Sequence, residues 1–264
     1  MHREIPFQNG TIAYDITGSG LPVMLIHGYL MSSQIWSEFI ELMQLKYQVI
    51  AIDLPGHGKS SSYPPVHSMD LMAESLKHVL LHEGVNKCYV IGHSMGGYVA
   101  LAFMEHFSKF IHKLILLNTH PFEDSEQKIA IRNRIISLMK KEKKEFLLRQ
   151  LLGDMISPTD EINYRQIRES AVKISSLQAI QNLIATTEGM KLRPDRSMLL
   201  KDPVVPVKWF LGRSDHQIDA EKMSVQAKKC SIPDPEIIEG GHMSFLELPF
   251  EIFRLVHGFF GDPV

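Results

Sequence analysis

A serine lies between two glycines in the stretch Gly92-His93-Ser94-Met95-Gly96, which matches the pattern Gly-x-Ser-x-Gly. An apolar run over 88–91 precedes it, and an apolar run at helical spacing over 98–107 follows it. A strand that turns sharply into a helix would hold a serine hydroxyl clear of the backbone. A Cβ at either glycine would clash in so tight a turn. The pattern therefore predicts a nucleophilic serine between a strand and a helix.

Two further residues could complete the chemistry of an activated serine. Asp215 follows an apolar run over 204–212, and His242 follows a short run over 235–238. A serine hydroxyl is a poor nucleophile at neutral pH, and one ring nitrogen of His242 would take its proton during attack on a carbonyl. Asp215 would accept the other ring N–H and stabilise the imidazolium that forms. We therefore predict that Ser94, Asp215 and His242 form a catalytic triad.

The elements that must position these residues alternate along the first half of the chain. Buried strands are expected over 22–26, 47–53, 87–91 and 113–118, with amphipathic helices between them. Asn9-Gly10 between two β-rich runs predicts an opening hairpin. Alternating strands and helices indicate an α/β protein with a parallel sheet and helices on both faces. Active groups collect at the carboxyl ends of such strands.

This alternation stops in the middle of the chain. Between 119 and 202 the apolar residues recur at helical spacing and no convincing buried strand is present, whereas strands resume after 203. We therefore predict a core domain formed by 1–118 and 203–264. The segment 119–202 is predicted to be a helical cap, or lid, inserted over the strand ends so that it roofs the site.

Four short motifs carry a resemblance to a known family. They are His27-Gly28, the loop Asp53-Leu54-Pro55-Gly56-His57-Gly58-Lys59-Ser60, the serine pentapeptide and Gly241-His242. With the chain order Ser, Asp, His, they resemble the small Ser-Asp-His hydrolases and esterases of the α/β-hydrolase superfamily. The likeness spans about 1–118 and 203–264. It implies a mostly parallel eight-stranded sheet with an antiparallel N-terminal hairpin, helices on both faces and a variable helical lid.

The resemblance also implies an oxyanion hole, because two backbone N–H groups must point at the oxygen that gains charge during attack. By resemblance these belong to Met95, just after the nucleophile, and Tyr29, just after the His27-Gly28 motif. Asp219 competes with Asp215 as the acid, but it is expected to begin the next helix. Asn118 stands at another family position for the acid and cannot carry the charge. Asp215 is therefore favoured over both Asp219 and Asn118 as the acid of the triad.

The predicted triad suits acyl transfer to water. The default function is a serine hydrolase that cleaves a carboxylic ester of a small to medium substrate through an acyl-enzyme on Ser94. Serine here argues against the dehalogenase and epoxide-hydrolase branches, which resemble this family but use aspartate. One alternative is a hydrolase or lyase of the same fold that breaks a carbon–carbon bond of a carboxylate substrate. Another is a non-catalytic receptor that holds a ligand under the lid.

Candidate pocket residues follow from their places on the loops and the lid. An apolar lining would suit an acyl chain. Besides Tyr29, the candidates are Leu30, Met31, His120, Phe122, Met155 and Met243. Arginines of the insertion could instead hold a carboxylate, and these are Arg132, Arg134, Arg149, Arg165, Arg168 and Arg193. His27 and His93 are expected to serve packing, and His57 and His216 to lie in loops.

Other kinds of site find little support. The chain has no His-Glu-x-x-His and no cluster of cysteines and histidines at zinc-binding spacing, so no metal is expected. Gly56-His57-Gly58-Lys59-Ser60 resembles only the tail of a phosphate-binding loop, since the early glycine is missing at the required spacing. We therefore expect no cofactor.

Composition limits the partners, disulfide bonds and membrane segments that can be expected. The formal net charge of -2 gives no general attraction to nucleic acid or anionic membranes. Two cysteines, Cys88 and Cys230, provide no disulfide framework, and free thiols are expected. The first residues are polar, and no apolar run approaches the roughly 20 residues of a membrane span. We expect a cytoplasmic monomer or homodimer that acts on a small-molecule acyl substrate, with no nucleic-acid or membrane partner.

Overall fold

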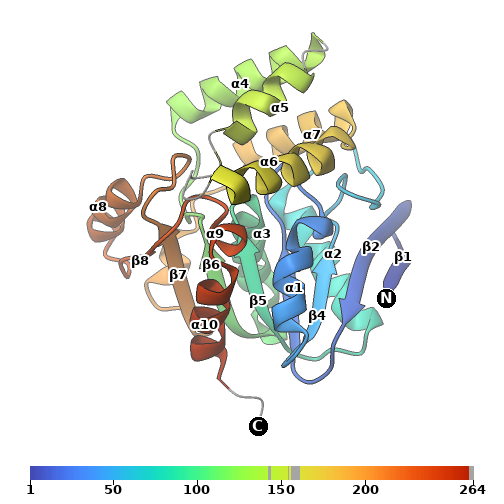
Figure 1. The fold of residues 1–264 in the computed structure, drawn as a ribbon, viewed down its shortest axis with the longest axis vertical. Helices are drawn as coiled ribbons and strands as arrows, with labels where there is room; N and C mark the ends of the chain where they lie inside the picture. The colour runs from blue at the N-terminus through green and yellow to red at the C-terminus, as the bar shows by residue number, and fades with distance from the viewer. Residues whose placement is uncertain (142–143, 154, 156–160, 262–264) are drawn as a thin grey trace.

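An eight-stranded sheet lies at the centre of the protein (Figure 1). The computed structural model describes residues 1–141, 144–153, 155 and 161–261. The strands run, from one edge to the other, in the order β1 (His2–Phe7), β2 (Gly10–Thr17), β4 (Gln48–Ile52), β3 (Pro22–Ile26), β5 (Cys88–His93), β6 (Ile111–Leu117), β7 (Val207–Gly212) and β8 (Glu236–Ile238). β2 pairs antiparallel with β1 and β4, and the other pairs are parallel. This is the mostly parallel α/β sheet that the sequence predicts.

Helices cover both faces of the sheet, as the alternating pattern predicts. The α-helices are α1 (Ser37–Met43), α2 (Met69–His82), α3 (Met95–Phe107), α4 (Glu126–Lys140), α5 (Lys144–Gly153), α6 (Glu161–Ser176), α7 (Ile180–Lys191), α8 (Ala220–Cys230), α9 (Ser244–Glu247) and α10 (Pro249–Phe260). The described residues also form the 3₁₀ turns η1 (Ser33–Trp36), η2 (Ser108–Phe110) and η3 (Ser197–Leu200). α2, α3 and α8 pack on one face, and α1, α9 and α10 pack on the other.

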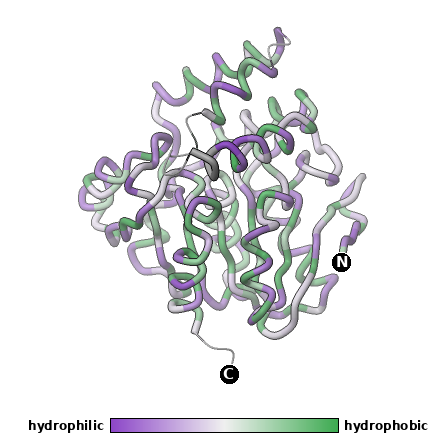
Figure 2. The backbone as a smooth tube through the Cα atoms, in the orientation of Figure 1, coloured by the Kyte–Doolittle hydropathy of each residue, from purple (hydrophilic) through white to green (hydrophobic). Residues whose placement is uncertain are grey.

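The central strands are apolar along both faces because each face is covered. In β3, Met24 and Ile26 join the core on the α2–α3 side, whereas Val23 and Leu25 join the core on the α1–α10 side. The hydropathy colouring in Figure 2 accordingly shows the inner strands as largely hydrophobic. Successive side chains of a strand point to opposite faces, so a strand buried twice needs a continuous apolar run. Such runs made these strands recognisable in the sequence.

The opening hairpin differs by one residue from the prediction. Phe7 pairs with Gly10, so the two loop residues are Gln8 and Asn9, and Gln8 takes the positive φ of 49°. Gly10 instead permits a close approach, since a Cβ there would lie 2.5 Å from Cβ of Ser61. Gly10 is therefore needed for packing against the loop after β4. A hairpin motif read from the sequence alone does not reveal such a tertiary contact.

Helices α4 to α7 lie beyond the carboxyl ends of the parallel strands (Figure 1). We call residues 126–191 the α4–α7 segment. Within it, α4 packs on α5 and α7, and α5 packs on α6. α6 also contacts α9 and η1 of the sheet-bearing part. In the described part of the chain, no helix combines the length and apolar character that a membrane crossing needs.

Four buried histidines make the fold sensitive to acid. Burial lowers the pKa of His27 and His67 to about 4, and that of His57 and His93 to about 3. Their ordinary pKa is about 6.5, so the unfolded chain binds protons below that pH while the native protein does not. The contribution of these histidines to the free energy of unfolding is therefore fully present above about pH 6.5, and it is lost as the pH falls toward 4.

We expect the free energy of unfolding to fall by about 1.4 kcal/mol per pH unit for each such histidine between pH 6 and 4.5. Urea unfolding at several pH values measures this slope. His57→Gln removes one of these rings, so the slope should become shallower by about one histidine, whatever the variant does to stability at pH 7. A flat profile between pH 7 and 4.5 would contradict the expectation.

Candidate active site

Ser94 lies at the sharp turn between the central strand β5 and helix α3. Its backbone has φ 52° and ψ −118°, a conformation that non-glycine residues rarely adopt. A Cβ at Gly92 would lie 2.5 Å from the carbonyl oxygen of Gly96, and a Cβ at Gly96 would lie 2.2 Å from that of Ile26. The two glycines therefore allow the close strand-to-helix packing that the sequence pattern predicts. The turn leaves the Ser94 side chain at the cavity surface.

The structure brings the three predicted catalytic side chains together. Nε2 of His242 lies 2.9 Å from Oγ of Ser94, and Nδ1 of His242 lies 2.8 Å from Oδ2 of Asp215. His242 follows β8 and Asp215 follows β7, so all three stand at carboxyl ends of strands of one sheet. When Nδ1–H donates to Asp215, Nε2 is free to accept the hydroxyl proton of Ser94.

Asp215 is buried and fully occupied by donors. Oδ1 accepts hydrogen bonds from the backbone N–H groups of Gln217 and Ile218 at 2.8 and 3.0 Å. Burial alone would raise the pKa of Asp215, but the charge and hydrogen bond of His242, helped by these two N–H groups, hold it below its usual value. The carboxylate is therefore ionised at neutral pH and suited to stabilise an imidazolium.

Asn118 supports this arrangement and has a role that the sequence did not reveal. Its Nδ2 donates to Oδ2 of Asp215 at 3.2 Å and to the carbonyl oxygen of Gly241 at 3.0 Å. Its Oδ1 accepts from the hydroxyl of Ser244 at 2.7 Å. One amide thus ties the ends of β6, β7 and β8 together and fixes the distance between acid and base.

Two backbone N–H groups lie beside the serine, where the resemblance places the oxyanion hole. Tyr29 and Met95 both line the cavity that contains Ser94. The loop that carries Tyr29 packs against the serine turn, since a Cβ at Gly28 would lie 3.2 Å from Cβ of Ser94. Within the described chain, neither N–H donates a hydrogen bond to the protein. Both are therefore available to a substrate oxygen.

The cavity at Ser94 is small and has a polar side. Its volume is about 80 Å³. It is lined by Tyr29, Ser94, Met95, Tyr98, His120, Lys128, Arg132, Met155, Met190, Gln217, Ile218 and His242. Of the six additional pocket candidates from the sequence, His120 and Met155 lie on this wall. A wider, open cleft of about 460 Å³ adjoins it and shares His120, Lys128, Gln217 and Ile218.

The other four pocket candidates lie elsewhere. Leu30, Met31 and Met243 are almost fully buried in the core on the α1–α10 side, not on the cavity wall. The chain turns back after Tyr29, where Leu30 has a φ of 70°. After this turn the side chains of Leu30 and Met31 point into the core. Phe122 packs in the other core and lines the open cleft.

Several lining residues were not singled out by the sequence. Tyr98 lies four residues after Ser94 on α3, and Gln217 and Ile218 follow directly on Asp215, so closeness in sequence to the triad was an available signal. Lys128 and Arg132 lie one turn apart on α4, and only Arg132 was among the candidate carboxylate-binding arginines. Arg193 is buried nearby, whereas Arg134, Arg149, Arg165 and Arg168 are exposed.

The neighbouring histidines serve packing. His27 lies 2.8 Å from the carbonyl oxygen of Gly28 through Nδ1 and accepts from the N–H of Leu54 through Nε2. His93 donates through Nε2 to the carbonyl oxygen of His242 at 2.8 Å, which ties the serine turn to the loop of the base. These contacts agree with the expectation that neither ring is the base.

Known proteins resemble this chain in sequence and fold. Residues 22–134 match the family model described as the alpha/beta hydrolase fold. The chain is 24% identical, over 78% of its length and 80% of the relative's, to the pimeloyl-[acyl-carrier protein] methyl ester esterase of Vibrio atlanticus. It is 38% identical to a non-heme haloperoxidase of Rhodococcus erythropolis over 42% of this chain and 41% of that one.

A solved structure agrees over nearly the whole chain. The thermophilic esterase from Thermogutta terrifontis, in a malate-bound form, superposes with a TM-score of 0.90 at 27% identity and covers 98% of both chains. The protein described here has the α/β-hydrolase fold. The esterases among its relatives identify it as a hydrolase of this fold.

Proposed function

We propose that the protein is a serine hydrolase that cleaves a carboxylic ester through an acyl-enzyme on Ser94. The observation that carries the proposal is the hydrogen-bonded chain from Asp215 through His242 to Ser94, which opens into a cavity beside two unpaired backbone N–H groups. The esterase relatives support the same reaction type. The α4–α7 segment, within 119–202, would form the cap over this cavity.

The reaction would proceed in two acyl-transfer steps. His242 takes the hydroxyl proton as Ser94 attacks the ester carbonyl, and the N–H groups of Tyr29 and Met95 stabilise the oxyanion. The imidazolium then gives its proton to the leaving alcohol, and an acyl-enzyme remains. Water, activated by the same imidazole, releases the acid. Asp215 stays ionised and stabilises the imidazolium in both steps.

The two alternatives have weaker support. Carbon–carbon bond cleavage of a carboxylate substrate would use the same serine turn, and the cations on α4 would suit its carboxylate. A receptor would need only the cavity. A receptor function would not explain why His242 is hydrogen-bonded to Ser94 or why Ser94 has a rare backbone conformation. We therefore favour ester hydrolysis.

A fluorophosphonate probe and an ester panel test the proposal. The purified protein should hydrolyse p-nitrophenyl acetate or butyrate and should take up the probe at a single site. Mass spectrometry of the digested adduct should place the label on the peptide that contains Ser94. A protein that hydrolyses no ester of the panel and is not labelled at Ser94 is not a serine esterase.

A further inference from the structure

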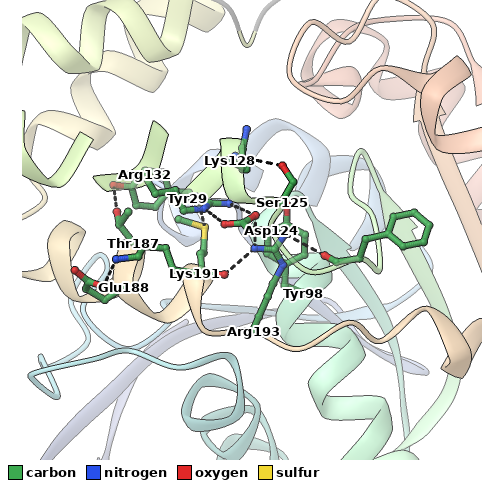
Figure 3. Close-up of polar contacts among 12 residues, drawn as sticks. Tyr29, Tyr98, Asp124, Ser125, Lys128, Arg132, Thr187, Glu188, Lys191 and Arg193 are labelled. Carbon is green, nitrogen blue, oxygen red and sulfur yellow. Dashed lines mark hydrogen bonds and ion pairs between the residues drawn. The ribbon is translucent and has the colours of Figure 1, made fainter. Parts of the chain in front are cut away.

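A cluster of charged side chains borders the catalytic cavity (Figure 3). Arg132 and Arg193 both pair with the single carboxylate of Asp124. Nη1 of Arg193 lies 2.7 Å from Oδ1 of Asp124, Nη2 of Arg132 donates to the same oxygen at 3.3 Å, and Nε of Arg132 pairs with Oδ2. All three side chains are nearly inaccessible to solvent.

Lys128 adds a third cation to this cluster. Within the described chain its ammonium group makes no ion pair or hydrogen bond. Burial, followed by the charge of Arg132, lowers the pKa of Lys128 and outweighs the opposing charges of Asp124 and Asp215. The carboxylate of Asp124 already pairs with Arg132 and Arg193, so the charge of Lys128 is not matched within the cluster. An unpaired charge in a partly buried place is unfavourable, and an anionic ligand would relieve it.

The position of Lys128 links this charge to the chemistry. Lys128 and Arg132 lie one helical turn apart on α4 and share the cavity wall with Ser94 and His242. Lys128 also lines the open cleft that adjoins the cavity. A ligand that reaches Ser94 from the cleft would therefore pass the ammonium group at the mouth of the cavity.

A neutral histidine stands at the same mouth. His120 lines both the cavity and the cleft, and its Nδ1 is buried without a partner in the described structure. Burial, with the charge of Arg193 as the next cause, lowers the pKa of His120 to about 3. The ring is therefore uncharged at neutral pH. It adds hydrogen-bonding capacity to the site and no charge.

We propose that the cavity accepts an ester that carries a second, ionised carboxylate, which binds between Lys128 and Arg132 while the ester carbonyl lies at Ser94. The proposal rests on the proposed esterase function and narrows its substrate class. Arg132 is held in place by Asp124, and Lys128 supplies the uncompensated charge. Charge-assisted hydrogen bonds to a carboxylate are stronger than neutral ones, so such a substrate gains affinity and a fixed orientation.

Matched ester pairs test the proposal, with acid release followed by pH-stat titration. Monomethyl succinate is compared with methyl butyrate, which has a methyl group in place of the carboxylate on the acyl side. Acetoxyacetate is compared with isobutyl acetate, which tests the alcohol side. For at least one pair, kcat/KM should be about 10- to 100-fold higher for the charged ester.

Variants of α4 assign the preference to one side chain. Lys128→Met should bring the charged-to-neutral ratio of kcat/KM close to one, whereas Lys128→Arg should retain most of it. Lys140→Met removes an exposed cation from the far end of the same helix and should leave the ratio unchanged. Equal ratios in the wild type, Lys128→Met and Lys140→Met would overturn the proposal while ester hydrolysis itself stands.

Binding of succinate separates the anion site from catalysis. Succinate should raise the thermal midpoint of the wild type and should not raise that of Lys128→Met. If no ester is hydrolysed but this difference appears, the esterase proposal fails and the anion site remains. If succinate stabilises both proteins equally or neither, and the ester ratios do not depend on Lys128, the anion site is wrong.

Discussion

Ser94→Ala is expected to lower kcat for ester hydrolysis by about 10⁶-fold. Without the hydroxyl no acyl-enzyme can form, and His242 has no nucleophile to activate. The residual rate would come from the remaining N–H donors of Tyr29 and Met95 acting on water attack. Steady-state kinetics on p-nitrophenyl butyrate measure the loss, and circular dichroism checks that the fold is retained.

A second serine variant controls for an unspecific effect of removing a hydroxyl. Ser68 caps α2 by accepting a hydrogen bond from the N–H of Leu71. Ser68→Ala should cost about 1 kcal/mol of stability and leave kcat within about twofold of wild type. The double variant Ser94→Ala/His242→Ala should be no slower than Ser94→Ala alone, because the two groups act as a unit. If the rate loss of the double variant equalled the product of the losses of the two single variants, His242 would act independently of Ser94.

Asp215→Asn is expected to lower kcat by about 10⁴-fold with little change in fold. The two N–H groups that bind Oδ1 would keep the amide oxygen on their side. The new NH₂ would then face Nδ1 of His242, where Oδ2 now lies. Nδ1 would have to accept instead of donate, which puts the proton on Nε2 and removes the base from Ser94.

Asp219→Asn is the matched control for the acid. Asp219 caps α8 by accepting from the N–H of Lys222 and is largely exposed. Its replacement should leave kcat near that of the wild type, since asparagine is also a good cap. A larger loss in Asp219→Asn than in Asp215→Asn would reverse the assignment of the acid.

The fold and the placement of the three reactive groups could be predicted from the chain because both depend on local patterns. Continuous apolar runs marked the doubly covered strands, and the residue after each strand had to lie at the same edge of the sheet. Asp219 stands at the start of α8, where the sequence predicted that a helix begins. The short helix α9 was missed, since four residues give no periodicity.

The walls of the cavity were not predictable in the same way. Met31 and Met243 are apolar and lie close in sequence to site residues, yet both point into the core. Lys128 was not among the candidates from the sequence, because its environment depends on how α4 packs above the sheet. Orientation of this kind is set by long-range packing between separate segments, which no local spacing encodes.

The path of the chain between β6 and β7 has a consequence for how such enzymes diversify. Those strands are neighbours, and the chain leaves one at Leu117 and enters the other at Val207. The indole of Trp209 donates to the carbonyl oxygen of Thr119 at 2.8 Å, which ties the departing and returning ends together. The chain between Thr119 and Val207 can change in length and sequence at small entropic cost while Asn118 and the residues that it positions keep their spacing. The insertion can therefore be remodelled, and a new substrate accommodated, without disturbing the three strand ends that carry the proposed catalytic residues.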